Sequence, residues 1–120
     1  MQAKRIMLVD DEPITNMINT RVLSKHMPGS EVKSFTFAPD ALAEIGDYAP
    51  DCIFLDLQMP VMDGWEFLQQ LKDGAITTPV IILTSSVSMQ DKDRSKGFAN
   101  VVRYLEKPLH PDYLQEAAFL

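Results

Sequence analysis

The sequence predicts an α/β fold in which a doubly wound, five-stranded parallel sheet carries five helices, some on each face. Two observations lead to this prediction: short apolar runs alternate strictly with segments of helical spacing, and most of the runs are apolar throughout. A strand that is apolar on both sides needs cover on both faces, and right-handed crossovers between parallel strands place helices there. The length of 120 residues suits one domain, so we expect residues 1–120 to fold as a single unit.

The first half of the chain predicts two strand–helix units. The apolar run from Arg5 to Asp10 is followed by a segment from Pro13 to about His26, and proline is suited to the first turn of a helix. Residues 31–37 mix polar and apolar side chains, which favours a strand near the sheet edge, and Pro39-Asp40 opens a second helix. The first helix carries apolar residues at the spacing of one helical face, namely Ile14, Met17, Ile18, Val22 and Leu23.

The second half continues the alternation. The pattern predicts strands at 52–56, 79–84 and 101–105, and helices at about 63–72, at 89–98 and from about Pro111, with Tyr113, Leu114 and Ala117-Ala118 facing inward. The segment 89–98 is rich in charge and has the weakest helical pattern of the three.

Composition excludes several classes of protein. The chain has 11 Lys+Arg against 17 Asp+Glu, a net charge of −6, and no basic stripe, which argues against direct binding of nucleic acid. Cys52, the only cysteine, lies in an apolar run, so we expect a buried thiol and a reducing, cytoplasmic location. The sequence has neither an apolar run of membrane-spanning length nor a secretory leader pattern, so we expect a soluble protein without membrane insertion.

Four predicted strands end at, or just before, residues that carry chemistry. These residues are Asp10-Asp11, Asp56, Thr84 and Lys107. Because ligands of doubly wound sheets bind beyond the carboxyl ends of the strands, we expect these side chains to meet at one edge of the sheet. The sequence therefore predicts one pocket that combines three carboxylates, a hydroxyl and an ammonium group.

Such a pocket favours phosphoryl chemistry assisted by a divalent cation. Three neighbouring carboxylates repel each other unless a cation joins them, and Mg²⁺ prefers oxygen ligands of this kind. Together with Lys107, one Mg²⁺ would neutralise the three carboxylates. Asp56 is the best candidate nucleophile, because it stands alone at the end of its strand and a carboxylate oxygen can form an aspartyl-phosphate.

Four segments of the chain resemble the receiver domains of two-component response regulators, the CheY-like superfamily. They are Leu8–Pro13, Leu55–Gly64, Leu83–Ser85 and Leu105–Pro108, in the order and at the separations of that family. The resemblance covers essentially the whole chain. It implies the flavodoxin-like strand order 2-1-3-4-5.

The resemblance also implies roles for individual residues. It makes Asp56 the phosphoacceptor, which receives its phosphoryl group from the phosphohistidine of a histidine kinase or of a histidine phosphotransfer protein. Asp11 resembles the direct Mg²⁺ ligand and Asp10 the neighbour that orients metal-bound water, while Asp56 and the backbone carbonyl of Gln58 complete the metal site. The side chain of Gln58 occupies a position that tunes hydrolysis of the phosphoryl group.

The resemblance further implies a switch. Lys107 would pair with the phosphoryl oxygens and precede a cis peptide bond to Pro108. Thr84 would donate its hydroxyl to the phosphoryl group, and Tyr104 would rotate inward in response. The partners implied are the phosphodonor, a downstream protein target or output domain, and a dimer formed on phosphorylation. Such a domain assists its own phosphorylation and dephosphorylation and is not a multiple-turnover enzyme.

Two other functions remain as alternatives. Haloacid-dehalogenase-type phosphatases also use an aspartyl-phosphate, but they place an acid/base Asp two residues after the nucleophile, where this chain has Gln58. A binding scaffold without phosphorylation is the second alternative, and the complete set of Asp11, Asp56, Thr84 and Lys107 argues against it. The chain is either a free-standing regulator or a domain cut from a larger one, and the apolar end of its last helix fits truncation.

Overall fold

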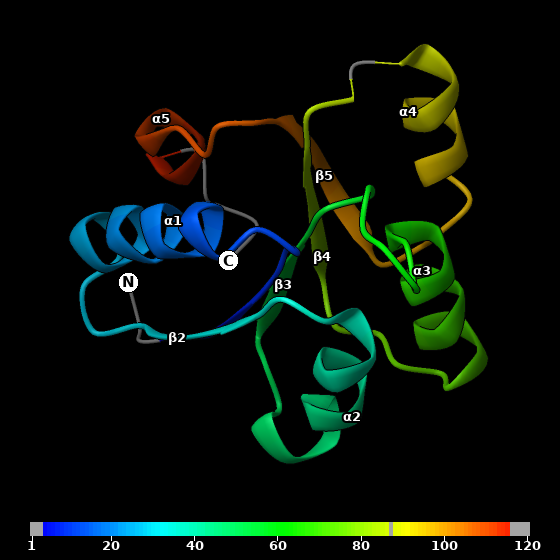
Figure 1. The fold of residues 1–120 in the computed structure, drawn as a ribbon, viewed down its shortest axis with the longest axis horizontal. Coiled ribbons are helices and arrows are strands. Elements are labelled where there is room, and N and C mark those ends of the chain that lie inside the picture. Colours follow the sequence, from blue (N-terminus) through cyan, green and yellow to red (C-terminus); the bar gives the residue numbers. More distant parts are fainter. Residues whose placement is uncertain (1–3, 87, 116–120) are drawn as a thin grey trace.

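The predicted alternation of strands and helices is present in the computed structural model of the protein, which describes residues 4–86 and 88–115 (Figure 1). All neighbouring strands pair in parallel, in the order β2-β1-β3-β4-β5, which confirms the predicted fold. The strands are β1 Arg5–Val9, β2 Glu31–Phe35, β3 Cys52–Leu55, β4 Val80–Thr84 and β5 Val101–Glu106. The helices are α1 Pro13–His26, α2 Ala38–Tyr48, α3 Gly64–Asp73, α4 Met89–Ser95 and α5 Pro111–Gln115.

The sheet separates two hydrophobic cores. Helices α1 and α5 cover one face, while α2, α3 and α4 lie on the other side (Figure 1). Successive strand residues point to opposite faces, so Ile6 and Leu8 of β1 pack with α1 and α5, whereas Met7 and Val9 pack with α2 and α3. The central strands β3 and β4 are buried along their whole length, because helices cover both of their faces.

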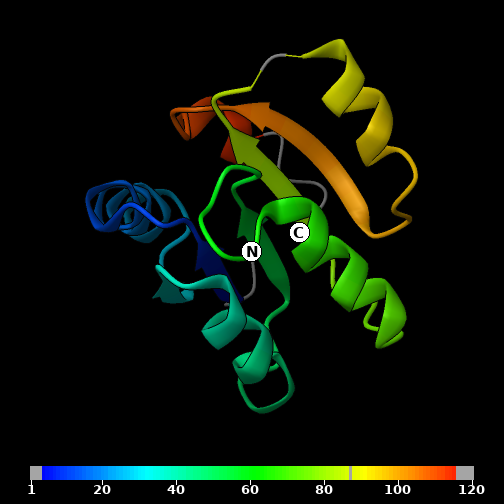
Figure 2. The same cartoon turned by 45° about the vertical axis from the view of Figure 1, so that its right-hand side comes forward.

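The two edge strands expose part of their side chains. Strand β2 mixes exposed and half-buried residues, as its mixed sequence predicts, and it ends at Phe35. Strand β5 forms the opposite edge and continues one residue past the predicted end, to Glu106. Helix α4 lies alongside this strand (Figure 2).

The helix ends follow local chemistry. Asp63 caps α3 through a capping box with Glu66, which fixes the start of the helix immediately after the loop that follows β3. Helix α4 ends at Ser95, before the predicted end at residue 98, and Phe98 stacks on Trp65 of α3 with ring centroids 6.1 Å apart. Helix α5 is described to Gln115, so the predicted inward packing of Ala117-Ala118 lies outside the described residues.

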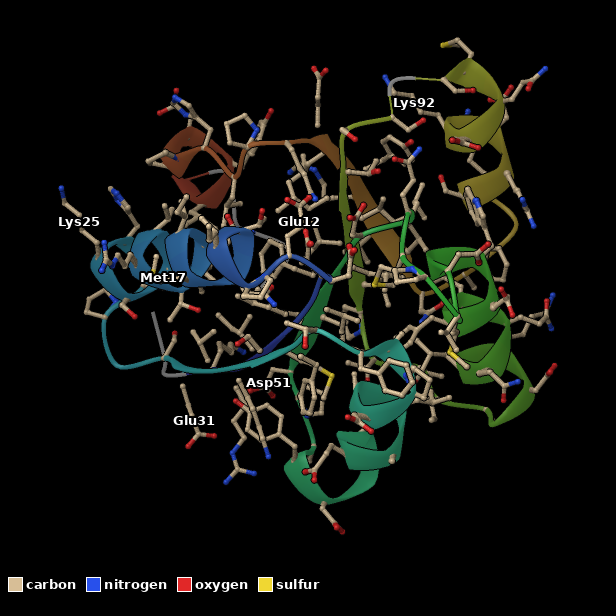
Figure 3. The ribbon with its side chains drawn as sticks, in the orientation of Figure 1. Glu12, Met17, Lys25, Glu31, Asp51 and Lys92 are labelled. Atoms are coloured by element: carbon tan, nitrogen blue, oxygen red, sulfur yellow. The ribbon has the colours of Figure 1, made fainter. Side chains whose placement is uncertain are left out.

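The first half of α1 exposes its apolar residues. Ile14, Met17 and Ile18, which fall at the spacing of one helical face, are 67%, 48% and 49% exposed. The buried positions are Asn16, Asn19 and Leu23. Met17 lies midway along the helix between Glu12 and Lys25 (Figure 3). This part of α1 therefore turns amide groups toward the sheet and apolar groups outward.

The helices are short. The longest, α1, has 14 residues, whereas a helix that spans a bilayer needs about 20 apolar residues. Among the residues that the structure describes, no helix meets the requirement for crossing a membrane.

Candidate functional site

The residues at the carboxyl ends of the strands meet at one edge of the sheet, as the sequence predicted. Asp10 follows β1 and Asp56 follows β3, and these two strands are neighbours with Val9 opposite Leu55. The backbone N–H of Asp56 donates to the carbonyl oxygen of Val9 at 3.0 Å, which continues the hydrogen-bond ladder between β1 and β3 to Asp56. The register of β1 and β3 therefore sets the two carboxylates side by side.

Three carboxylates form a compact acidic group. One carboxylate oxygen each of Asp10, Asp11 and Asp56 lies within 4.8 Å of the others. Asp10 and Asp56 are each only 5% exposed, while Asp11 is half-buried. Negative charges this close and this poorly hydrated repel each other, so the group favours a bound cation.

Lys107 supplies a positive charge to the acidic group. Its ammonium nitrogen lies 2.6 Å from Asp10 Oδ2 and 3.0 Å from Asp56 Oδ2. The backbone N–H of Lys107 donates to the carbonyl oxygen of Thr84 at 2.8 Å, and the Lys107–Pro108 peptide bond is cis, as the resemblance implied. The end of β5 is thereby fixed to the end of β4, with the ammonium group between the carboxylates of β1 and β3.

The pKa of Asp10 and the pKa of Lys107 are both raised in the folded protein. The change favours the neutral form of Asp10 and the charged form of Lys107. Burial raises the pKa of Asp10, and the hydrogen bonds from Lys107 and from the Glu12 backbone oppose that change without cancelling it. For Lys107, burial disfavours the charged form, but hydrogen bonds to Asp10 and Asp56 outweigh it and raise the pKa of the ammonium group. Lys107 is therefore held as a cation.

The loop after Asp56 is shaped by close packing. The backbone N–H of Gln58 donates to Asp56 Oδ1 at 3.3 Å, so Gln58 lies at the site, and its carbonyl as a metal ligand stays a prediction. A Cβ atom on Gly64 would lie 2.6 Å from the carbonyl oxygen of Asp56, so only glycine fits there. Val61 adopts φ of 69°, a left-handed conformation that is strained for a β-branched residue.

Thr84 and Tyr104 lie on the side of the site that faces α4. Thr84 is fully buried at the end of β4, and its Oγ1 accepts a hydrogen bond from the Ser86 N–H at 3.4 Å. The hydroxyl of Tyr104 donates to the carbonyl oxygen of Ser86 at 3.0 Å. Burial raises the pKa of Tyr104, and the ammonium of Lys92 on α4 lies 5.9 Å from the ring centroid. Ser86 thus connects the predicted switch residues.

The sequence did not single out three residues that shape the site. Ser86 joins Thr84 to Tyr104, and its hydroxyl donates to Asp91 of α4 at 2.7 Å. Gly64 belongs to a recognised motif, but its role in packing against Asp56 requires the structure. Asn16 is buried at 3% exposure and donates to the Asp10 carbonyl oxygen at 2.9 Å. Its sequence signal is weak: two asparagines three residues apart in a helix that starts beside the acidic pair.

The comparisons with other sequences agree with this geometry. Residues 6–119 match the family described as "Response regulator receiver domain". The transcriptional regulatory protein TrcR of Mycobacterium tuberculosis is 33% identical over 89 residues, which cover 73% of this chain and 34% of that protein. The cell cycle response regulator CtrA of Brucella ovis is 40% identical over 73 residues, covering 61% of this chain and 30% of that protein. The chain spans about a third of the length of these relatives.

Solved structures show the same architecture. The chemotaxis protein CheY4 of Vibrio cholerae superposes with a TM-score of 0.83 at 27% identity, covering 97% of this chain and 96% of that chain. A two-component response regulator from Cytophaga hutchinsonii gives a TM-score of 0.86 at 26% identity, covering 97% and 94%. With the family match over nearly the whole sequence, the chain belongs to the response regulator receiver domains of two-component systems.

Proposed function

We propose that the domain accepts a phosphoryl group on Asp56 in a Mg²⁺-dependent reaction and passes the signal on through a change in protein contacts. The observation that carries this proposal is the placement of the Asp56 carboxylate, which lies in one acidic group with Asp10 and Asp11 and contacts the Lys107 ammonium at 3.0 Å. The donor is the phosphohistidine of a histidine kinase or of a phosphotransfer protein, the partner class of this family.

The acidic group fits Mg²⁺. Mg²⁺ takes oxygen ligands in octahedral geometry and usually binds one or two carboxylates together with water and phosphate oxygens. Asp11 is the most accessible of the three carboxylates and would hold the ion with Asp56 and the Gln58 carbonyl, while Asp10 would orient water at the ion. When bound, the ion supplies charge neutralisation at the phosphoryl oxygens.

The chain's own residues perform the remaining steps. A carboxylate oxygen of Asp56 attacks phosphorus; the new P–O bond forms as the P–N bond to the donor imidazole breaks, and the imidazole nitrogen keeps the bonding pair. Lys107 is placed to exchange its contacts with Asp10 and Asp56 for contacts with phosphoryl oxygens, because its ammonium lies between them. The Asp56 carboxylate is poised by the hydrogen bond from the Gln58 N–H.

The hydrogen bonds of Ser86 with Thr84 and Tyr104 connect the proposed phosphorylation site to the surface of the domain. In our proposal Thr84 turns its hydroxyl to the bound phosphoryl group, which ends its hydrogen bond with the Ser86 N–H and moves the loop before α4. Tyr104, now hydrogen-bonded to the Ser86 carbonyl oxygen, then turns inward. The surface formed by α4 and β5 changes shape and binds a downstream protein or output domain.

Incubation with Mg²⁺ and acetyl phosphate, read by intact mass, tests the proposal. We expect one phosphoryl adduct on the wild-type chain, none on Asp56→Asn, and a normal adduct on Asp47→Asn, whose side chain is exposed on α2. No adduct on the wild-type chain, or an adduct that survives Asp56→Asn, contradicts the proposed acceptor. Sustained release of phosphate from a phosphomonoester would assign a hydrolase instead.

A further inference from the structure

The inward face of α1 is polar near the acidic group. Asn16 and Asn19 are 3% and 4% exposed, so both amide side chains lie almost wholly inside the protein. Burying an amide without hydrogen-bond partners destabilises the folded state. Leucine at either position would avoid that cost, so we expect each buried amide to have hydrogen-bond partners.

The orientation of the Asn16 amide is fixed by two backbone carbonyl oxygens. Its Nδ2 donates to the carbonyl oxygen of Asp10 at 2.9 Å and to that of Phe35 at 3.3 Å. The reverse orientation would set an acceptor against two acceptors. The Oδ1 atom therefore has a defined place, and within residues 4–86 and 88–115 no donor reaches it, although it is completely buried.

A small cavity lies beside these amides and beneath the acidic group. Its volume is about 10 Å³, and a single water requires roughly 10–15 Å³ with two to four polar partners. Four of the lining residues are polar, and the others belong to β1, β3 and β4. The lining consists of Asp10, Asn16, Asn19 and Asp56 together with Leu8, Val9, Phe54, Leu55 and Leu83.

The hydrogen-bonding groups that line the cavity determine which molecule it can hold. Asn16 Oδ1 accepts hydrogen bonds only, and the carboxylates of Asp10 and Asp56 are also acceptors. A molecule that bridges Asn16 Oδ1 and a carboxylate must donate two hydrogen bonds and be no larger than one water. The side-chain amide of Asn19 can donate a hydrogen bond to the oxygen of such a molecule.

We propose that Asn16 and Asn19 hold one buried water that hydrogen-bonds the acidic group from the protein side. The water donates one proton to Asn16 Oδ1 and the other to a carboxylate oxygen of the Asp10–Asp56 pair. The two asparagines are positioning residues: they orient the carboxylates through the water and do not touch the reacting atoms. This role rests on the proposed function, because it assigns those carboxylates to Mg²⁺ binding.

Crystal structures of the wild-type chain and of Asn19→Leu test the water directly. We expect one ordered water at hydrogen-bond distance from Asn16 Oδ1 in the wild-type chain, and no water in Asn19→Leu, where the larger apolar side chain fills the cavity. A dry cavity in the wild-type chain overturns the proposal. This measurement needs neither Mg²⁺ nor phosphorylation, so it stands even if the proposed function fails.

Calorimetric titration with Mg²⁺ tests the positioning role. Outer hydrogen bonds to metal ligands typically contribute 10–100-fold in affinity, so we expect Asn19→Leu to bind Mg²⁺ about 10-fold more weakly. Thr20→Val is the matched control, because it removes the hydrogen bond from Thr20 Oγ1 to the Asn16 carbonyl oxygen and leaves the cavity lining intact. Equal Mg²⁺ affinity of the wild-type chain and Asn19→Leu overturns the role, whereas a wild-type chain that binds no Mg²⁺ overturns the proposed function.

Discussion

Replacing Lys107 by methionine gives the sharpest test of the electrostatics. The change keeps much of the side-chain volume and removes the ammonium group that contacts Asp10 at 2.6 Å and Asp56 at 3.0 Å. Both carboxylate side chains are more than nine-tenths buried, at 7% and 6% exposure, so water replaces little of the lost interaction. Removing one partner of a buried ion pair costs roughly 3–5 kcal/mol.

The expected loss lies near the lower end of that range, about 3 kcal/mol, because the Lys107 side chain is itself 17% exposed. With a urea dependence of about 1.5 kcal/mol per molar, the unfolding midpoint falls by about 2 M at neutral pH. We expect Mg²⁺ to reduce the loss, since a cation should bind the unneutralised carboxylates more tightly and stabilise the variant more than the wild-type chain.

Urea unfolding followed by circular dichroism, with and without Mg²⁺, measures both effects. Lys96→Met is the control, because Lys96 pairs with Asp93 on the surface at 79% exposure, and its loss costs less than about 1 kcal/mol. A loss for Lys107→Met no larger than for Lys96→Met would refute the electrostatic reasoning. A second outcome is that Mg²⁺ leaves unchanged the difference in free energy of unfolding between Lys107→Met and the wild-type chain. That result would refute the idea that the Lys107 ammonium and the metal ion neutralise the same carboxylates.

Three further predictions concern the loop after Asp56 and the core. Gly64→Ala should unfold at clearly lower urea, because the new Cβ would lie 2.6 Å from the Asp56 carbonyl oxygen; Gly46→Ala, where nothing lies within 4 Å, is the control that should not. Val61→Gly should raise the free energy of unfolding by about 1 kcal/mol, because φ of 69° is strained for valine, and an unchanged urea midpoint would show that the strain is absent. Burial raises the pKa of Cys52 from 9.0 to about 12, so at pH 8 the native thiol should react with Ellman's reagent at least 100-fold more slowly than the thiol in urea, and equal rates would contradict its burial. Because the native pKa is the higher one, the Cys52 contribution to stability is complete below about pH 9 and is lost as the pH rises toward 12.

The strand-end residues were predictable because a parallel sheet brings its carboxyl ends to one edge. The positions of Asp10, Asp56 and Thr84 follow from the strand pattern alone, and Lys107 follows because β5 pairs with β4. The sequence could not supply the contact between Tyr104 and Ser86. That contact depends on the path of the loop between β4 and α4, which no periodic pattern describes.

The sequence pattern of α1 did not show which side of the helix faces the sheet. Helical spacing shows which residues share a side of a helix, but it does not show which side meets the sheet. Ile14, Met17 and Ile18 share one side, as expected, but that side is exposed. The Asn16 amide instead hydrogen-bonds the carbonyl oxygens of Asp10, just after β1, and Phe35, the last residue of β2, and these bonds exist only in the folded chain.

The wide separation in sequence of the residues around Asp56 makes the site an indicator of complete folding. Lys107 contacts Asp56 across 51 positions in the sequence, and Asp10 joins them from the end of the first strand, just after Val9. A partly folded chain that lacks β5 retains the Asp56 carboxylate, the proposed phosphoacceptor, without its ammonium partner. Labelling of Asp56 by acetyl phosphate should therefore report the fraction of molecules in which the sheet is complete from β1 to β5, and it should disappear together with global structure during unfolding.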